Sequence, residues 1–289
     1  MSTLNILLQF ILPHHALSRL ALWLTRVRWP PLKNLLIGLF LRGFKPDLSD
    51  AQLADPYAYA DFNAFFTRAL RPGARPLAGD ARTVVSPVDG AMNLCGRLDA
   101  DRLLQAKGRW YTLEALLAGA APRWAASFRD GGFATIYLAP FNYHRIHMPA
   151  DGRLAAAWYV PGRLFSVNTV AARLVPQLFA RNERLVLLFE GASGPFAVIF
   201  VGALNVGSMA TVWHGDVTPR RPRVVAELPL PPADQCWRER GAEIGRFNMG
   251  STVIVLFAPA AAELADIAGG TPLRMGQRLG ELRGGARPA

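Results

Sequence analysis

The sequence predicts an α+β protein: a mainly β body with short helices, preceded by amphipathic helices at the N-terminus. Two observations lead to this fold class. Leucine-rich stripes at helical spacing occupy residues 1–46, whereas strand-like apolar runs bounded by turn residues dominate after residue 76. Few helical segments separate these runs, so the chain does not show the alternation of a βαβ protein.

The composition is that of a folded chain with excess positive charge. Of the 289 residues 51% are hydrophobic and 18% are charged, so the chain can bury a substantial core and is too apolar to be largely disordered. A net charge of +11 predicts a polyanionic partner, either nucleic acid or an anionic membrane surface. Cys95 and Cys236 stand far apart, which suggests neither a zinc site nor a disulfide framework and favours a reducing compartment.

The N-terminal region carries its positive charges among apolar helical stripes. Breaks at Pro13 and Pro30–Pro31 predict short helices, and no run reaches the roughly 18 apolar residues of a spanning helix. The first positive charge follows the apolar stretch, which is the wrong order for a signal peptide. Trp23 and Trp29 favour helices that lie in a membrane interface. The basic residues, all before the first acid at Asp47, are Arg19, Arg26, Arg28, Lys33, Arg42 and Lys45.

Two alternatives apply to this region. The helices could pack on the globular body, or they could bind nucleic acid, which we favour less because groove or strand binding does not require so much leucine. We place a domain boundary after residue 75, which gives an N-terminal helical membrane-associating region over 1–75 and a β-rich domain over 76–289.

The expected elements follow from the period of the apolar residues. Helices are predicted over 57–70, 112–118 and 167–179. Strands are predicted over 83–85, 133–138, 154–160, 185–189, 196–204, 206–213 and 252–257.

Candidate chemistry lies in three segments of the β body. Asp89 sits in an Asp-Gly turn just after a short strand, where an ordinary turn aspartate is the simpler interpretation. His144 and His147 share one loop; their spacing is a weak metal pair without a third ligand, and acid/base work is the better functional interpretation, with loop and core histidines as the alternative. Gly250-Ser251 precedes an apolar strand and by itself predicts only a turn.

Together these residues could form an Asp-His-Ser relay. In a hydrolase Ser251 would attack an ester, but no Gly-x-Ser-x-Gly surrounds it. Alternatively, Ser251 could attack the carbonyl of Gly250, where the missing side chain permits close approach.

The chain closely resembles the bacterial phosphatidylserine decarboxylase proenzymes of the pyruvoyl-dependent class. The resemblance covers nearly the whole chain, in the family's order. Its matching stretches are 86–90, 105–108, 113–119, 143–149, 160–168, 179–184 and 245–259. Met249 is one departure, since the family often has leucine there, and the two side chains are similar in volume.

The resemblance implies self-processing followed by decarboxylation of phosphatidylserine to phosphatidylethanolamine. Ser251, deprotonated by His147 with Asp89 behind it, would attack Gly250; the ester would then eliminate to leave a pyruvoyl group in place of Ser251. The chain would split into a β chain (1–250) and an α chain (251–289), which form a heterodimer and can pair into a dimer of heterodimers. The pyruvoyl ketone would form a Schiff base with the substrate amine, so the implied cofactor is this group, with no metal and no pyridoxal phosphate.

The lysines give a separate reason to disfavour pyridoxal chemistry, which needs a Schiff-base lysine. Lys33 and Lys45 lie in the basic N-terminal region, which leaves Lys107 as the candidate.

The resemblance also assigns further roles. His144 would reprotonate the carbanion or contact the substrate carboxylate, and Ser166 and Asn168 would line the head-group pocket. The expected location is peripheral, on the cytoplasmic face of the cell membrane, where anionic lipid is both surface and substrate. Two rival functions remain: a membrane-associated serine hydrolase that keeps Ser251, and an uncleaved, non-enzymatic lipid-binding homologue.

Overall fold

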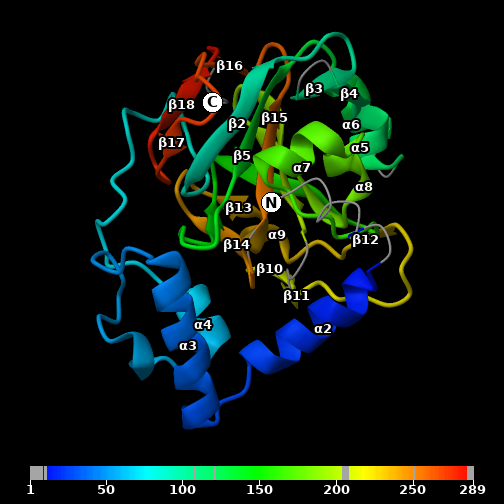
Figure 1. Cartoon of the computed structure of the whole chain (residues 1–289). Coiled ribbons are helices and arrows are strands. Elements are labelled where there is room, and N and C mark those ends of the chain that lie inside the picture. The colour runs from blue at the N-terminus through cyan, green and yellow to red at the C-terminus, as the bar shows by residue number, and fades with distance from the viewer. Residues whose placement is uncertain are drawn as a thin grey trace.

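Strands dominate the computed structural model, which describes residue 9 and residues 12–106, 109–119, 122–203, 208–249 and 251–284 (Figure 1). Its helices are α2 (His14–Thr25), α3 (Pro30–Phe44), the 3-10 helix η1 (Pro56–Ala58), α4 (Phe62–Phe66), α5 (Leu113–Leu117), α6 (Pro122–Ser127), α7 (Thr169–Leu174), α8 (Leu178–Arg181) and α9 (Ala233–Cys236).

The strands are distributed over the whole chain after residue 80. They are β1 (Thr83–Val85), β2 (Gly90–Arg97), β3 (Arg102–Ala106), β4 (Arg109–Thr112), β5 (Gly132–Tyr137), β6 (Arg145–His147), β7 (Gly152–Val160), β8 (Arg184–Gly191), β9 (Gly194–Val201), β10 (Met209–Thr211), β11 (Gly215–Asp216), β12 (Ala226–Glu227), β13 (Trp237–Arg238), β14 (Glu243–Phe247), β15 (Thr252–Phe257), β16 (Ala262–Leu264), β17 (Pro272–Leu273) and β18 (Arg278–Leu282).

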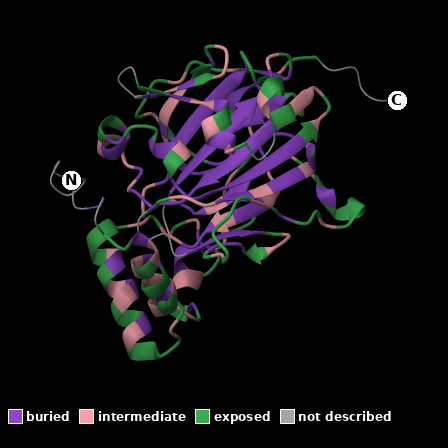
Figure 2. Cartoon of the chain, turned by 90° about the vertical axis from the view of Figure 1, so that its right-hand side faces the viewer, coloured by how far each residue is buried: buried purple, intermediate pink, exposed green. Residues whose placement is uncertain are grey.

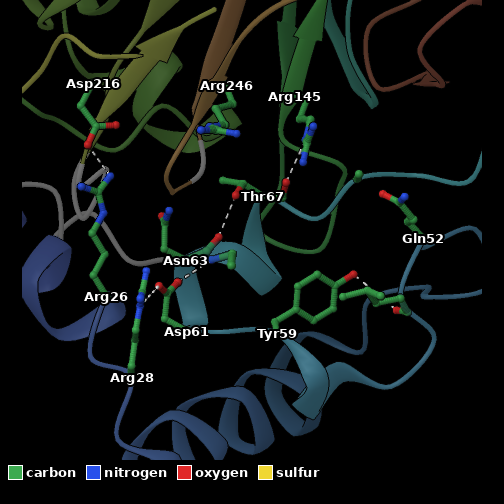
Figure 3. Close-up of a pocket in the computed structure, with 13 residues that line it drawn as sticks. Arg26, Arg28, Gln52, Tyr59, Asp61, Asn63, Thr67, Arg145, Asp216 and Arg246 are labelled. Carbon is green, nitrogen blue, oxygen red and sulfur yellow. Dashed lines mark hydrogen bonds and ion pairs between the residues drawn. The ribbon is translucent and has the colours of Figure 1, made fainter.

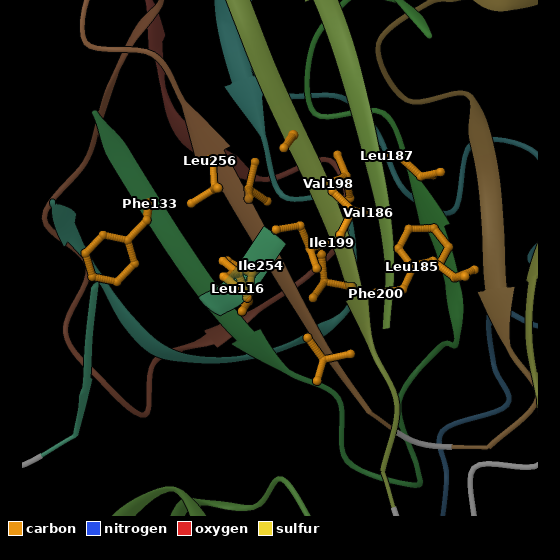
Figure 4. Close-up of a cluster of buried hydrophobic side chains, with 14 of the residues drawn as sticks. Leu116, Phe133, Leu185, Val186, Leu187, Val198, Ile199, Phe200, Ile254 and Leu256 are labelled. Carbon is orange, nitrogen blue, oxygen red and sulfur yellow. The ribbon is translucent and has the colours of Figure 1, made fainter. Parts of the chain in front are cut away.

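A central antiparallel sheet carries the main core. Its strand order is β12-β7-β8-β9-β15-β5-β2-β17, with β13 also paired to β7. β15 lies inside this sheet, with Thr252 opposite Tyr137 of β5 on one side and Val201 of β9 on the other. Every residue of β15 is buried, because apolar layers cover both faces of the sheet, as Figure 4 shows around Ile254 and Leu256.

A smaller sheet with the order β11-β10-β14-β6 lies beside the N-terminal helices. Its pairing places Arg246 opposite Arg145, and Glu243 opposite His147. β1, β18 and β16 form a further sheet, and β3 and β4 form a hairpin.

The helix α3 forms a separate apolar cluster with α4. Phe40 of α3 makes edge-on contacts with the rings of Phe62, Phe65 and Phe66, and Ile37 is fully buried among them. The surfaces of α2 and α3 that face away from the rest of the protein are exposed to solvent. A larger share of residues is therefore exposed in these helices than in the strands (Figure 2). Large apolar side chains on that surface are Leu20, Trp23, Trp29, Leu35 and Leu39.

Much of the expected secondary structure is confirmed. The predicted strands at 83–85, 133–138, 154–160, 185–189 and 252–257 correspond to β1, β5, β7, β8 and β15, and α5 corresponds to the helix predicted at 112–118. Breaks before α2 and α3 fall at the predicted prolines, whereas the helix expected before Pro13 lies largely outside the described residues. Across the part of the chain that the structure describes, no helix is both long and apolar enough to cross a bilayer.

Two predicted helices were wrong in extent. Residues 57–70 hold only η1 and α4, because Asp61 is extended and its side chain caps α4 through a 2.7 Å bond from the amide of Ala64. Residues 167–179 divide into α7 and α8, because Pro176 and the left-handed Gln177 (φ 53°) interrupt the helix. The predicted strands at 196–204 and 206–213 end early, at Val201 and Thr211, and residues 204–207 lie outside the described chain.

Candidate functional site

The loop that holds Asp89 and the strand β6, which holds His147 and directly follows His144, lie side by side. The amide of His147 donates to the carbonyl of Pro87 at 2.9 Å, and the amide of Val85 donates to the carbonyl of Pro149 at 2.9 Å. Gly90 permits this loop to pass close to β5, since a Cβ there would lie 2.4 Å from the carbonyl oxygen of Tyr137. The predicted aspartate and histidine motifs therefore belong to one structural unit.

Asp89 is held by an arginine and a backbone amide. Arg75 donates from Nε to Oδ1 at 3.0 Å and from Nη2 to Oδ2 at 2.7 Å, and the amide of Met275 donates to Oδ1 at 2.8 Å. Arg75 also binds Asp50 at 2.6 Å. The hydrogen bonds to Asp89 raise the pKa of Arg75 most, and the bond to Asp50 raises it further. Burial lowers this pKa by less, so the guanidinium group stays charged.

His147 is buried and held through both ring nitrogens. Nδ1 lies 2.7 Å from the carbonyl oxygen of Gly241 and therefore donates to it, which leaves Nε2 to accept from the hydroxyl of Tyr143 at 3.0 Å. Burial lowers the pKa of His147 below 6.5, and the bond to Gly241 only partly offsets that shift. The ring is therefore neutral at pH 7 and available as a base.

The expected Asp89–His147 hydrogen bond is not among the contacts of the described chain. The Asp89 charge acts on His147 only through space, as one of the smaller influences that raise its pKa. In this arrangement Gly241 and Tyr143 orient the imidazole, and Arg75 orients the carboxylate.

His144 is fully buried beside the N-terminal aromatic cluster. Its Nδ1 donates to the carbonyl of Asn142 at 2.8 Å, its ring centre lies 4.2 Å from that of Phe66, and its carbonyl accepts from the amide of Phe247 at 3.0 Å. Burial lowers the pKa of His144 to about 3, so the ring is neutral. Its Nε2 is buried and has no partner in the described structure, which makes it a free acceptor.

Ser251 stands at the entrance to β15. Its carbonyl accepts from the amide of Leu138 at 2.8 Å, which fixes its backbone beside β5. Its hydroxyl is buried and has no hydrogen-bond partner within the described chain. Gly250 lies outside the described residues, so the predicted cleavage bond itself has no structural account.

Ser166 and Asn168 lie on the loop before α7. The Asn168 side chain caps α7 through the amide of Ala171 at 2.9 Å and donates to Ser166 Oγ at 3.1 Å. This loop contacts the N-terminal helix, since the amide of Leu164 donates to His14 Nδ1 at 3.3 Å. The predicted head-group residues therefore adjoin the N-terminal region.

Sequence reasoning missed Arg75, Tyr143 and Arg68. Arg75 is the last residue of the N-terminal region predicted over 1–75, and Tyr143 lies in the matching stretch 143–149, but the sequence gives neither a role in the site. Arg68 is buried, yet its Nε and Nη1 have no partner in the described chain; its Nη2 donates to Phe141 at 3.3 Å. One cavity of about 330 Å³ is lined by Arg68, Arg75, Asp89 and Tyr143.

Among the described residues, no three His, Cys, Asp or Glu side chains gather as a metal site requires.

Comparisons with known proteins relate the whole chain to one enzyme family. A family model described as phosphatidylserine decarboxylase matches residues 62–281, and a model described as PSD matches residues 4–45. A phosphatidylserine decarboxylase proenzyme of Methylococcus capsulatus is 49% identical over 278 residues, which cover 96% of both chains. Proteins of the same name from Stutzerimonas stutzeri (48% identity, 96% of this chain and 94% of the relative) and Bordetella avium (50%, 94% and 92%) are similarly related.

Proposed function

The chain belongs to the phosphatidylserine decarboxylase family, and we propose that it removes the carboxyl group of phosphatidylserine to give phosphatidylethanolamine. One observation carries this proposal: phosphatidylserine decarboxylase proenzymes align with 96% of this chain at 48–49% sequence identity.

We propose that activation begins with self-cleavage of the Gly250–Ser251 bond. His147, neutral and oriented by Gly241, takes the hydroxyl proton of Ser251 as the oxygen attacks the Gly250 carbonyl, and the amide bond gives way to an ester. Loss of the Ser251 α-proton then expels the Gly250 carboxylate, and the dehydroalanine left at residue 251 takes up water and releases ammonia. A nearby carboxylate at Asp89 favours the protonated imidazole that the first step creates.

The residues around Ser251 fit the pyruvoyl group that the family implies. The position is buried and fixed by the bond from Leu138, and His144 offers a buried, unpartnered Nε2 as an acceptor. When formed, a pyruvoyl group supplies a carbonyl electron sink for the electrons released with CO2. His144 Nε2 is the atom that we assign to proton transfer or to the substrate carboxylate; Ser166 and Asn168 are our proposed head-group contacts.

We assign membrane contact to the N-terminal helical region, residues 1–75, and catalysis to residues 76–289. Support comes from the separate apolar cluster of α3 and α4 and from the exposed tryptophans Trp23 and Trp29. Amphipathic aromatic side chains suit a bilayer interface, and basic residues favour anionic lipid. The proposed location is peripheral, at the cytoplasmic face of the membrane.

After cleavage we expect the β chain (1–250) and the α chain (251–289) to remain one heterodimer, with a dimer of such pairs as the larger assembly. β15 hydrogen-bonds to β5 and β9 of the larger chain, and β18 hydrogen-bonds to β1.

The test is denaturing mass spectrometry of the purified protein together with a decarboxylation assay. We expect a blocked fragment over residues 251–289, an intact Ser251→Ala chain, and CO2 release from phosphatidylserine by the wild type alone. An uncleaved wild-type chain that is labelled at Ser251 by a fluorophosphonate would favour the serine hydrolase. An uncleaved chain that binds vesicles without turnover would favour the lipid-binding homologue.

A further inference from the structure

A second cavity, separate from the residues of the proposed catalytic site, lies where the N-terminal helices meet the smaller sheet. It encloses about 530 Å³, and neither Asp89, His144, His147 nor Ser251 lines it. Figure 3 shows Arg145 and Arg246 reaching from the sheet side towards α4, with Arg26 and Arg28 across from them. Other polar lining side chains are Gln52, Tyr59, Asn63 and Thr67.

Positive charge exceeds negative charge around this cavity. The charged residues that line it are Arg26, Arg28, Arg145 and Arg246 against Asp61 and Asp216. These arginines come from the end of α2, the link to α3, β6 and β14, so folding brings them together from distant parts of the chain.

The arginines differ in how far their charge is already neutralised. Arg26 is 2.5 Å from Asp216, and Arg145 is 2.8 Å from Glu243. Arg28 is 3.9 Å from Asp61, with 80% of its side chain exposed. Arg246 is partly buried, and its guanidinium group has no hydrogen bond or ion pair within the described chain, although its backbone pairs with β6 and β10. Two guanidinium groups can therefore receive an anion.

The wall of the cavity adjoins the segment that leads to Ser251. Asn248 donates to Asp216 at 3.1 Å and accepts from Asn63 of α4 at 3.2 Å. Asp216 in turn binds Arg26 at the end of α2. An anion in contact with Arg246 would thus lie against a network that joins the end of α2 and the helix α4 to Asn248, just before the cleavage position.

We propose that this cavity binds the phosphate group of an anionic phospholipid at a site other than the catalytic one. A guanidinium group matches phosphate well, because its planar fork donates paired hydrogen bonds and its charge is only weakly hydrated. The neighbouring Trp29 and the α3 residues Leu35 and Leu39 are exposed apolar side chains suited to the lipid around such a headgroup. Free inorganic phosphate presents the same chemistry, so the experiment separates these two sources.

The test uses the full chain with Ser251→Ala, which keeps it uncleaved and removes decarboxylation from the measurement. Sedimentation with phosphatidylcholine vesicles, with and without phosphatidylglycerol, gives lipid affinity, and calorimetric titration gives affinity for inorganic phosphate. Arg246→Gln and the mostly exposed Arg28→Gln are the test variants. Arg129→Gln removes the same charge as a control, because Arg129 is exposed and follows α6 closely in the chain, and Figure 1 shows α6 at the opposite end of the molecule from α3.

We expect each test variant to weaken phosphatidylglycerol-dependent binding about tenfold, because each removes a charge-assisted hydrogen bond to the phosphate. Arg129→Gln should weaken it by less than about fivefold, the general contribution of one surface charge. Loss of phosphate binding in Arg246→Gln with unchanged vesicle binding would overturn the assignment to a phospholipid and leave a site for free phosphate. Equal effects of Arg246→Gln, Arg28→Gln and Arg129→Gln in both titrations would overturn the proposal, and neither result depends on whether the wild type is a decarboxylase.

Discussion

Arg75 donates hydrogen bonds to both carboxylate oxygens of Asp89, from Nε at 3.0 Å and from Nη2 at 2.7 Å. Its remaining terminal nitrogen, Nη1, binds Asp50 at 2.6 Å. The acid of the proposed relay is thereby tied to the N-terminal region. Because the Asp89 carboxylate is nearly buried, the arginine compensates for its loss of hydration.

Asp89→Asn should slow self-cleavage. The substitution removes the negative charge that favours protonated His147, and we expect the rate to fall by about 100-fold or more. The measurement is the fraction of cleaved chain with time after synthesis, read on a denaturing gel. Asp80→Asn, at an exposed turn, is the matched control. Cleavage of Asp89→Asn at the wild-type rate would remove Asp89 from the relay.

The pH dependence of self-cleavage should follow His147. Its folded pKa lies below 6.5, so the neutral base persists as the pH falls past 6.5 and is lost only at the lowered pKa. Tyr143→Phe removes the hydroxyl that stabilises the neutral ring through Nε2, and it should move the acid limb of the rate profile to higher pH. His147→Ala should accumulate uncleaved chain. An unshifted limb in Tyr143→Phe would mean that another group titrates.

Acid should destabilise the uncleaved chain through its buried histidines. His144 has a pKa of about 3 when folded and about 6.5 when unfolded, so the unfolded chain binds the additional proton between these values. The contribution of His144 to the free energy of unfolding is complete above pH 6.5. Between pH 6.5 and about 3, the free energy of unfolding falls by roughly 1.4 kcal/mol for each pH unit because of this residue. Urea unfolding of Ser251→Ala against pH measures the slope. Adding His144→Gln should flatten it, and an unchanged slope would contradict this assignment.

Two buried arginines should respond oppositely to replacement by methionine. Arg184 donates to the carbonyls of Ala115, Leu116, Ala180 and Asn182, so Arg184→Met leaves these acceptors unpaired and should cost about 3 kcal/mol or more. Arg68 makes one long bond and leaves Nε and Nη1 unpaired, so Arg68→Met should change stability by less than about 1 kcal/mol or increase it. Urea unfolding in the Ser251→Ala chain compares them, and equal losses would refute the distinction.

Membrane contact through the N-terminal helices should depend on their exposed tryptophans. Trp23→Ser and Trp29→Ser remove side chains that are 66% and 64% exposed, so stability should hold within about 0.5 kcal/mol. Each should weaken vesicle binding about tenfold if the ring enters the interface. Trp237→Ser, on a body residue that is 45% exposed, is the control. If Trp237→Ser alone weakens binding, the membrane contact lies on the body.

The sequence allowed β15 to be predicted, since Thr252–Phe257 is a continuous apolar run and such runs form buried strands. It did not reveal β14, because Glu243–Phe247 mixes charged, small and apolar residues, and β14 acquires its strand form from pairing with β6 and β10. Asp89 and His147 stood out as motif residues. Their partners did not: Met275 is 186 positions from Asp89, and only the tertiary fold brings its amide there.

The position of β15 between β5 and β9 also determines whether the small chain can exchange between molecules. A strand with neighbours on both edges cannot leave a sheet without breaking two ladders of hydrogen bonds, so the small chain should not exchange between molecules once it has been cut. Each active molecule would then contain two pieces of the same translated chain. Its quaternary structure is inherited from one folding event, and an inactive copy cannot be repaired by a fragment from its neighbour.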